Sequence, residues 1–423
     1  MAQQSTISLW DASAAESDLR ASLEGDCTTD LAIVGGGFTG LSTALHTANK
    51  GIGCRVLEAK QIGFGGSGRN VGLVNAGLWL PPQDVRAQLG EKHGGALVKT
   101  LGEAPGYVRS LIERYQIRCE ATWNGTIHAA HSPKGFEDLA RRAEEWERLE
   151  APVELLSREK AIDMIGTSGF HGGLLDHRAG TINPMGYARG LARAAEAAGA
   201  KIHTGVLVKN LRREAGTWVV ETDCGTLRAR YVVLGTNAYT DGLWPGLRDT
   251  FTKIHYFQLA TVPLGDRAKT ILRGGQGLWD TGAIMFSLRR DAFGRLIIGS
   301  MGTVVGGMKG LSRRWAARML NRLFPALGVV QFEHCWHGQI AMTPDHLPRM
   351  LRLAEGLYTP IGYNGRGITP GTIFGKAMAD LLAEGSEEDL PLPVTEPKAV
   401  KGGSVMSHLY QAAFTANQAL KCF

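Results

Sequence analysis

Near its start, the chain combines a glycine-rich turn with a carboxylate at a spacing that suits a bound dinucleotide. The run Gly35-Gly36-Gly37-Phe38-Thr39-Gly40 has the pattern GxGxxG. Gly35 permits a tight turn, Gly37 lets a pyrophosphate approach backbone N–H groups, and Gly40 lets a helix pack closely on a strand. Glu58 follows Gly40 by 18 residues, and its carboxylate suits a ribose diol and would repel a 2′-phosphate. We therefore expect a dinucleotide other than an NADP-type ligand.

The elements around this motif decide its weight, because a GxGxxG run alone is weak evidence. Residues 31–34 form a short apolar run typical of a buried parallel strand. Residues 41–48 have apolar positions at helical spacing, which predicts a helix that Gly51 ends. Residues 54–57 predict a second strand directly before the Glu58 carboxylate. The helix N-terminus would face the phosphates with its partial positive charge. The alternative is a glycine-rich turn in an ordinary α/β domain.

A second glycine-rich stretch favours FAD over NAD. Residues 61–72 follow the carboxylate almost at once, where a simple NAD domain would be expected to enter another helix. Small residues with Ser67, Arg69 and Asn70 would let the chain lie along an extended cofactor, with donors near its pyrophosphate and flavin edge. An NAD-dependent dehydrogenase remains the alternative for this stretch.

A third feature is the loop at residues 361–368, which Thr369 and Pro370 follow. Threonine is a good N-cap and proline is favoured at the first helical position, so we expect a helix that Thr369 caps. A helix N-terminus with exposed N–H groups can stabilise negative charge on a ligand, such as the charge that reduction of a flavin places near N1 and the C2 carbonyl. The alternative is an ordinary glycine-rich loop before a capped helix.

The chain resembles the FAD-dependent D-amino acid oxidase, glycine oxidase and sarcosine oxidase superfamily, and is most similar to its gamma-glutamylputrescine oxidoreductase branch. The matching motifs occur in one order over almost the whole chain. They are residues 9–11 (LWD), 32–42 (AIVGGGFTGLS), 62–70 (IGFGGSGRN), 173–177 (GLLDH), 234–239 (LGTNAY), 336–338 (WHG) and 362–367 (GYNGRG).

This resemblance implies an α/β chain in which a Rossmann-like FAD domain is interleaved with a mixed-sheet, α+β substrate domain. The expected FAD domain comprises residues 1–85, 151–240 and 336–390, and the substrate domain comprises residues 86–150 and 241–335. Residues 391–423 form a tail, in which Met406, Leu409, Tyr410, Ala413 and Phe414 make an apolar helical stripe. We expect the stripe to dock on the parent chain, with a partner or membrane surface as the alternative.

The resemblance also indicates which residues contact FAD. The sarcosine oxidase branch attaches its flavin through a cysteine near this C-terminal region, where Ala341-Met342-Thr343 has no thiol and Cys335 lies early, so non-covalent FAD is expected. In the family, the valine at the position of Val208 contacts the adenine through its backbone. The expected cofactor residues are Gly35, Gly37, Phe38, Thr39, Gly40, Glu58, Ala59, Ser67, Gly68, Arg69, Asn70, Gly72, Val208, Gly235, Asn237, Gly338, Gly362, Asn364, Gly365, Arg366, Gly367 and Ile368.

The substrate residues are harder to assign. In relatives that bind carboxylates, an arginine and a tyrosine clamp the carboxylate, and the planar guanidinium suits this role. The candidates are Arg289, Arg290, Arg349 and Arg366, with Tyr256 or Tyr363 as partner. Lys253 and His255 could place a cation near flavin N5. The expected catalytic set is Arg366, Tyr256, Lys253 and His255, and a surface or structural role is the alternative for each.

The implied reaction is oxidation of the C–N bond of a small amine or amino acid. A hydride passes from the carbon to flavin N5, the resulting imine is hydrolysed, and oxygen or another acceptor reoxidises the flavin. The substrate would be of the gamma-glutamylputrescine type, or else a D-amino acid or N-methyl amino acid. The alternative of another class is a flavin-binding scaffold without turnover.

Composition narrows the partners. The chain has 423 residues, 44% apolar and 20% charged, with a net charge of +6 and no dense basic stripe, so no nucleic-acid partner is expected. Scattered cysteines, no N-terminal signal and no long apolar stretch predict a cytoplasmic protein without a membrane span. His334, Cys335 and His337 lack recognisable further ligands, so no metal is expected. This composition is compatible with an oligomer.

Overall fold

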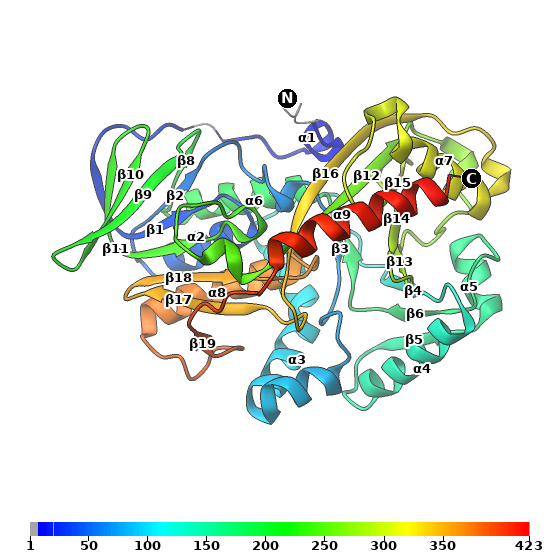
Figure 1. Cartoon of the computed structure of the whole chain (residues 1–423), viewed down its shortest axis with the longest axis horizontal. Coiled ribbons are helices and arrows are strands. Elements are labelled where there is room, and N and C mark those ends of the chain that lie inside the picture. Colours follow the sequence, from blue (N-terminus) through cyan, green and yellow to red (C-terminus); the bar gives the residue numbers. More distant parts are fainter. Residues whose placement is uncertain (1–6, 20, 423) are drawn as a thin grey trace.

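A computed structural model describes residues 7–19 and 21–422, and it contains two large β-sheets with helices around them (Figure 1). This mixed arrangement confirms the predicted α/β class. Residues 1–6 and 20, in the first predicted FAD segment, and residue 423, in the predicted tail, lie outside the described residues.

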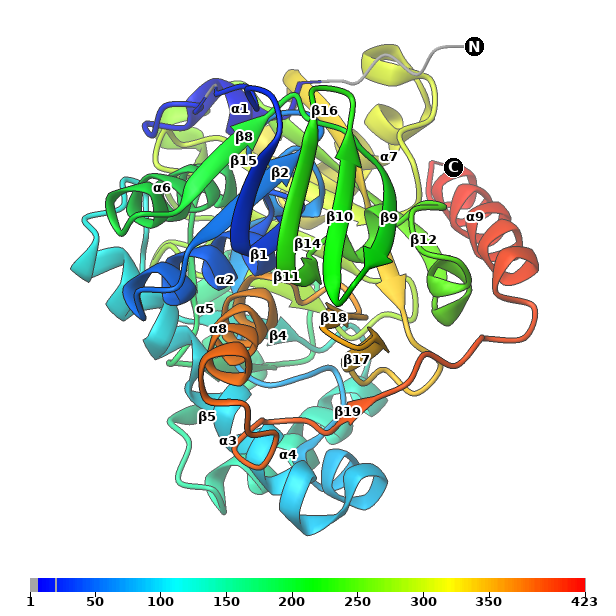
Figure 2. The same ribbon diagram turned by 90° about the vertical axis from the view of Figure 1, so that its left-hand side faces the viewer.

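The first sheet is mostly parallel, and β1 lies at its centre, paired with β11 on one side and β2 on the other. The strands of its main path are β19 (Val394–Thr395), β17 (Arg349–Ala354), β18 (Leu357–Ile361), β11 (Thr226–Leu234), β1 (Cys27–Val34), β2 (Cys54–Glu58) and β8 (Lys201–Thr204). The strands β9 (Val208–Glu214) and β10 (Thr217–Thr222) extend β11 as an antiparallel meander (Figure 2).

Both faces of this sheet are covered. Leu31 and Ile33 of β1 point toward a helical layer and share its core, whereas Ala32 and Val34 share a core with the meander. This alternation follows from the two-residue period of a strand. The helical layer consists of α2 (Phe38–Asn49), α3 (Pro82–Arg114), α6 (Pro184–Ala197) and α8 (Ile368–Glu384).

The second sheet is mixed, and only β13 and β4 pair in parallel. Its order is β16 (Phe332–Met342), β12 (Thr252–Thr261), β15 (Leu296–Met301), β14 (Phe286–Arg290), β13 (Gly277–Asp280), β4 (Thr126–Ala129), β6 (Gly173–Asp176) and β5 (Val153–Leu156). One face packs on α7 (Leu311–Leu323), where the rings of Phe257 and Trp315 meet edge to face at 5.1 Å. The helices α4 (Pro133–Glu147) and α5 (Arg158–Ile165) lie at the β5 end (Figure 1).

Sheet membership differs from the predicted domain ranges in several places. Helix α3, predicted with the substrate domain, shares the helical core of the first sheet through Leu97, Leu101 and Val108. Strands β5 and β6, predicted within residues 151–240, and all of β16 belong to the second sheet. Strand pairing joins segments far apart in sequence, and local apolar patterns do not report which segments pair.

The C-terminal helix α9 (Gly403–Leu420) lies across the second sheet beside β12 and α7 (Figure 1). It docks through Gly403, Phe414 and Gln418, which are buried, while Leu409 of the predicted stripe is 57% exposed. The predicted docking stripe is therefore wrong except for Phe414. Polar contacts decide the orientation, because Ser312 Oγ donates to Gln418 Oε1 at 2.8 Å and Gln411 Nε2 donates to Thr303 Oγ at 2.9 Å.

The remaining elements are small: the short helix α1 (Leu9–Ser13) and the two-stranded sheet of β3 (Leu73–Val74) and β7 (Gly180–Thr181). Trp10 of α1 is fully buried and donates its indole N–H to the carbonyl of Asn70 at 2.8 Å, which ties the N-terminal segment to the second glycine-rich stretch. Across the described residues, no helix has an apolar stretch long enough to cross a membrane.

Candidate active site

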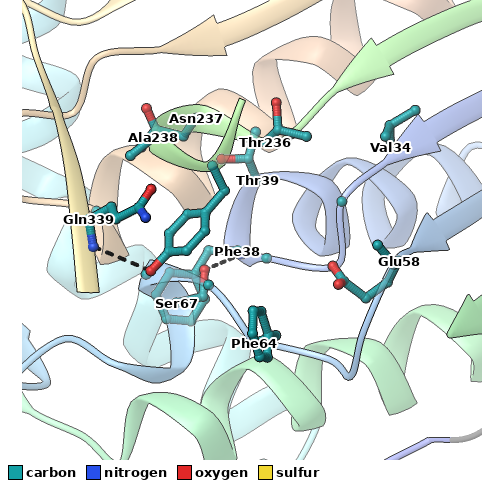
Figure 3. Close-up of a pocket in the computed structure, with 18 of the residues that line it drawn as sticks. Val34, Phe38, Thr39, Glu58, Phe64, Ser67, Thr236, Asn237, Ala238 and Gln339 are labelled. Carbon is teal, nitrogen blue, oxygen red and sulfur yellow. Dashed lines mark hydrogen bonds between the residues drawn. The ribbon is translucent and has the colours of Figure 1, made fainter. Parts of the chain in front are cut away.

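A cavity of about 330 Å³, the first cavity, lies at the carboxyl ends of β1 and β2 (Figure 3). In open α/β sheets, this edge is where ligands bind. Val34 and Glu58 end the two strands and line the cavity, and residues 235–239 after β11 line it from the neighbouring strand. Segments distant in sequence therefore meet here because their strands are neighbours in the sheet.

The turn between β1 and α2 leaves its backbone N–H groups accessible because its glycines have no side chains. The packing around these glycines also leaves no space for a side chain. Gly35 has a φ of +109°, and a Cβ on Gly40 would lie 2.0 Å from the carbonyl oxygen of Gly35. Gly37 is the N-cap of α2 and provides no side-chain cap, so the partially positive helix end faces the cavity. Ser67 Oγ accepts the N–H of Phe38 at 3.0 Å, joining the two glycine-rich stretches (Figure 3). This cradle fits a pyrophosphate.

Glu58 is held by backbone donors at the cavity edge. Its Oε2 accepts the N–H of Gly36 at 2.7 Å and its Oε1 accepts the N–H of Lys60 at 2.8 Å. Burial raises the pKa of Glu58, and the two N–H donors and the Lys60 charge oppose this shift. The carboxylate is thus oriented before any ligand arrives, as ribose recognition requires.

Most of the predicted cofactor residues line this first cavity. They are Gly35, Gly37, Phe38, Thr39, Glu58, Ala59, Ser67, Asn70, Val208, Gly235, Asn237, Gly365 and Gly367. Others line the second cavity described below, namely Asn364, Arg366 and Ile368. A last group lines neither cavity: Gly40, Gly68, Arg69, Gly72, Gly338 and Gly362.

This last group shapes the backbone around the cavities. A Cβ on Gly68 would lie 2.3 Å from Met185 Cε, and one on Gly72 would lie 2.2 Å from the carbonyl oxygen of Ile182. Arg69 donates through Nε to the carbonyl of Phe64 at 2.8 Å, within its own loop. These positions therefore contact other parts of the chain closely, and their direct contact with the cofactor stays a prediction.

Sequence reasoning missed some residues that line the first cavity, among them Phe64, Tyr239 and Gln339. Tyr239 Oη accepts the N–H of Gln339 at 3.3 Å, which links the end of the first sheet to β16 (Figure 3). Tyr239 had a signal, since it stands in the run after a buried strand, where ligands bind. Gln339 had none, because it lies inside a strand.

The loop before α8 differs from its prediction at the helix start. The helix begins at Ile368 with Gly367 as N-cap, so the predicted capping by Thr369 is wrong. The Thr369 hydroxyl instead donates to the carbonyl of Asn75 at 3.0 Å. Asn364 and Gly365 have φ values of +53° and +89° and turn the chain toward the cavities. With Gly367 as its N-cap, α8 directs an N-terminus without a side-chain cap toward this site.

A second cavity, of about 110 Å³, adjoins the first, and both are lined by Asn70, Tyr256, Ile340, Gly365 and Gly367. It extends between the second sheet and the loop before α8. Its other walls are largely apolar and aromatic, with Trp79, Trp279, Met285 and Phe286. A small, mostly apolar pocket beside a cofactor cavity suits a small organic substrate.

Arg366 places a charge in this second cavity. Its guanidinium packs against the indoles of Trp79 and Trp279, which contact each other edge to face; its Cζ lies 4.8 and 4.9 Å from the ring centroids, and its Nη1 donates to the carbonyl of Ala76 at 2.7 Å. Its Nε has no hydrogen-bond partner among the described residues. Burial lowers the pKa of Arg366 to about 9, which is still above neutral pH, so the group remains charged.

The other candidate arginines have structural partners. Arg289 is fully buried and donates to backbone carbonyls, including that of Ile182 at 2.5 Å. Arg290 donates to the carbonyl of Ala268 at 2.9 Å, and Arg349 forms an ion pair with Asp345. None of the three lines either cavity.

The remaining predicted residues fall into two groups, one that lines the cavities and one that does not. Tyr256 lines both cavities and Tyr363 lines the first, where its hydroxyl lies 2.8 Å from that of Thr39. Lys253 and His255 line neither cavity, because successive side chains of β12 alternate between its faces. His255 instead lies near His337, with their ring centroids 6.2 Å apart.

Comparison with known proteins agrees with this geometry. Residues 30–381 match the family model described as FAD dependent oxidoreductase. Gamma-glutamylputrescine oxidoreductase of Escherichia coli (strain K12) is 32% identical over 85% of this chain and 85% of its own length. Probable oxidoreductase OrdL of Rhizobium meliloti (strain 1021) is 29% identical over 90% of this chain and 89% of its own length.

Solved structures share the fold. Glycine oxidase from Geobacillus kaustophilus superposes with a TM-score of 0.67 at 22% identity, covering 85% of this chain and 95% of that one. L-proline dehydrogenase from P. horikoshii superposes with a TM-score of 0.70 at 20% identity, covering 86% and 95%. The family model matches most of the chain, and the nucleotide-binding turn and the oriented Glu58 carboxylate fit the cofactor of that family. This chain therefore belongs to the FAD-dependent oxidoreductases and binds FAD.

Proposed function

We propose that this chain oxidises the C–N bond of a small amine or amino acid and that the substrate binds in the second cavity. The observation that carries the proposal is the shared wall of the two cavities, where Tyr256 and the loop residues Gly365 and Gly367 contact both spaces. A substrate in the second cavity would then lie against the reactive end of a cofactor in the first. The 32% identity to a gamma-glutamylputrescine oxidoreductase favours an amine of that type.

The lining of the second cavity favours hydride transfer from a neutral amine. Among the described residues that line it, there is no aspartate, glutamate, histidine or lysine to act as a general base. The positive charge of Arg366 disfavours an ammonium ion, so the amine enters with its lone pair free. When bound, FAD supplies the acceptor for the hydride that leaves the carbon. Loss of the hydride from a neutral amine leaves an iminium ion, and water hydrolyses it to a carbonyl compound and an ammonium ion, so that no base from the protein is needed.

The residues of the chain then orient the substrate and exclude water. Tyr256 stands at the boundary of the two cavities and is 9% exposed, so it is placed to align the reacting carbon. None of the described cysteines lines the first cavity, which supports the proposal that FAD is held without a covalent bond.

A carboxylate-bearing substrate is the second candidate. Arg366 favours it, because this buried residue lines a cavity without a carboxylate and its Nε has no partner among the described residues. A D-amino acid or an N-methyl amino acid would provide that group, and sarcosine oxidase subunit beta of Rhizobium meliloti (strain 1021) is 28% identical.

The test is anaerobic mixing of the purified holoenzyme with amines and amino acids while the visible flavin absorbance is followed. Bleaching by gamma-glutamylated or secondary amines is the expected result, and bleaching by D-amino or N-methyl amino acids alone would favour the second candidate. Admitting air then distinguishes oxygen from another acceptor. A yellow protein that no compound in either class bleaches would contradict the proposed function and favour a flavin-binding scaffold.

A further inference from the structure

Strand β12 presents two buried polar side chains, each opposite a glycine of a neighbouring strand. Tyr256 pairs with Gly338 of β16, and Gln258 pairs with Gly299 of β15. A Cβ on Gly338 would lie 2.4 Å from Tyr256 Oη, and one on Gly299 would lie 2.3 Å from Gln258 Oε1. The glycines thus make the space that these two polar groups occupy.

Both polar groups have an oxygen without a partner. Gln258 is 3% exposed, and its Nε2 donates to Ser287 Oγ at 3.3 Å. This bond leaves Oε1 buried with no hydrogen bond to any described residue, and Tyr256 Oη is in the same state. Buried acceptors are almost always satisfied, so an unpaired one that lines a cavity points to a donor on a ligand.

The two residues differ in their distance from the cofactor. Tyr256 lines both cavities, whereas Gln258 lines only the second. The two residues point to the same face of β12, and their backbone positions are about 7 Å apart along the strand. The reacting carbon must lie within about 3.5 Å of its acceptor, on the side of the shared wall. Gln258 therefore faces a part of the substrate that is more distant from the cofactor than the part beside Tyr256.

Resting on the proposed function, we infer that Gln258 Oε1 accepts the N–H of a second, distal nitrogen of the substrate, several bonds from the oxidised carbon. An acylated short-chain diamine, the type of amine already favoured above, has such a nitrogen. Simple α-amino acids are too short to reach both positions. Gln258 is a specificity-determining residue, and Ser287 holds its amide in the required orientation.

A matched pair of ligands isolates this contact. The first is an N-acetylated short-chain diamine, and the second is the acetate ester of the amino alcohol of equal length, which lacks only the distal N–H. The dissociation constant of each for the holoenzyme is measured from the flavin spectrum under anaerobic conditions, together with the rate of bleaching. The wild-type protein is expected to bind the amide roughly tenfold more tightly than the ester.

Two variants and one control locate the effect. Gln258→Met keeps the side-chain length and removes both polar ends, and it should bring the amide-to-ester ratio close to one. Gln258→Glu retains an acceptor oxygen and should keep a preference for the amide. Gln276→Met is the control, because Gln276 is also buried with an unpartnered Oε1 but lines none of the described cavities; its ratio should equal that of the wild type.

An amide-to-ester ratio of one in the wild-type protein would overturn the inference without the need for any variant. So would a wild-type preference that survives Gln258→Met. A preference that depends on Gln258, in a protein whose flavin neither ligand bleaches, would support the distal contact and contradict the proposed oxidation. Failures of the two proposals are thus distinguishable.

Discussion

The two adjoining cavities are built in opposite ways. Around the first, polar groups of the chain satisfy one another before a ligand arrives: Glu58 accepts the N–H of Gly36, and Ser67 accepts that of Phe38. In the second, Gln258 Oε1 and Arg366 Nε are buried without partners among the described residues, and so are Tyr256 Oη on the shared wall and Gln339 Oε1 on the β16 side of the first cavity. The end of the first cavity at β1 and β2 is therefore preorganised for the cofactor, whereas unsatisfied groups gather at the second cavity and at the wall formed by β12 and β16.

This contrast separates the residues that bind the cofactor from the residues that select the substrate. The nucleotide-binding end of the first cavity uses residues close in sequence on β1, α2 and β2, so its chemistry follows from one motif, although more distant segments complete the cavity. The second is assembled from β12, β14, β15 and the loop before α8, which the fold brings together. We expect substitutions in the first to act on cofactor binding and those in the second to act on the choice of substrate.

The largest effect is expected from Gly40→Val, which disrupts the preorganised turn between β1 and α2 at the first cavity. Its Cβ would meet the carbonyl oxygen of Gly35 at 2.0 Å, so the turn cannot keep its shape. The protein should purify colourless or fail to fold, as checked by visible absorbance and circular dichroism. Gly106→Ala is the control, because a Cβ there meets nothing within 4 Å, and it should stabilise the fold by about 0.5–1 kcal/mol. A yellow Gly40→Val protein with unchanged melting would contradict this.

Arg366→Met tests the substrate side. Loss of the buried charge should raise the KM of carboxylate substrates roughly a hundredfold, while amines without a carboxylate change much less. The measurement is steady-state turnover on both classes, with Arg349→Met, which lines neither cavity, as control. An equal loss for both classes would show that Arg366 supports the Trp79 and Trp279 rings rather than a ligand.

Glu58→Gln should weaken FAD binding by about tenfold, because the amide accepts more weakly from ribose hydroxyls and from the N–H of Gly36. Flavin fluorescence on release from the protein measures the change, with the exposed Glu24→Gln as control. The KM for substrate at saturating FAD should stay the same. A changed substrate preference would mean that the two cavities are not as separate as described.

The smallest effect concerns pH. Burial, and then the charges of His337 and Lys253, lower the pKa of His255 to about 4 from 6.5. Stability from the neutral imidazole is therefore fully present above pH 6.5 and is lost as the pH falls from 6.5 toward 4. Tm should fall over this window, and His255→Gln should flatten the decline where the exposed His408→Gln does not. Because His255 lines neither cavity, FAD affinity at pH 7 should not change.

The sequence predicted the nucleotide-binding unit well because its strand, turn, helix and carboxylate are neighbours along the chain. A tertiary contact explains the error at α8: the carbonyl of Asn75, distant in sequence, takes the Thr369 hydroxyl, and the helix begins two residues earlier than Pro370 with Gly367 as its N-cap. Arg366 could be preferred among the four arginines because it stands in the loop before α8, but the structural role of Arg289 could not be predicted, because the carbonyls that it contacts come from segments distant in sequence. Gln258 had no signal, since its partners come from other strands.

The glycines opposite Tyr256 and Gln258 have a consequence for how substrate range evolves in this protein. A side chain at Gly338 or Gly299 alone collides with its neighbour, and shrinking Tyr256 or Gln258 alone leaves a void. At Gly338, the three atoms nearest to an added Cβ all belong to the Tyr256 side chain, so exchanging these two residues would move the bulk from β12 to β16. At Gly299, the carbonyl oxygen of Phe257 would lie 2.2 Å from the Cβ, so an exchange with Gln258 would not remove the clash. We therefore expect epistasis between Tyr256 and Gly338: each change is harmful by itself, and together they remodel the pocket while the backbone stays in place.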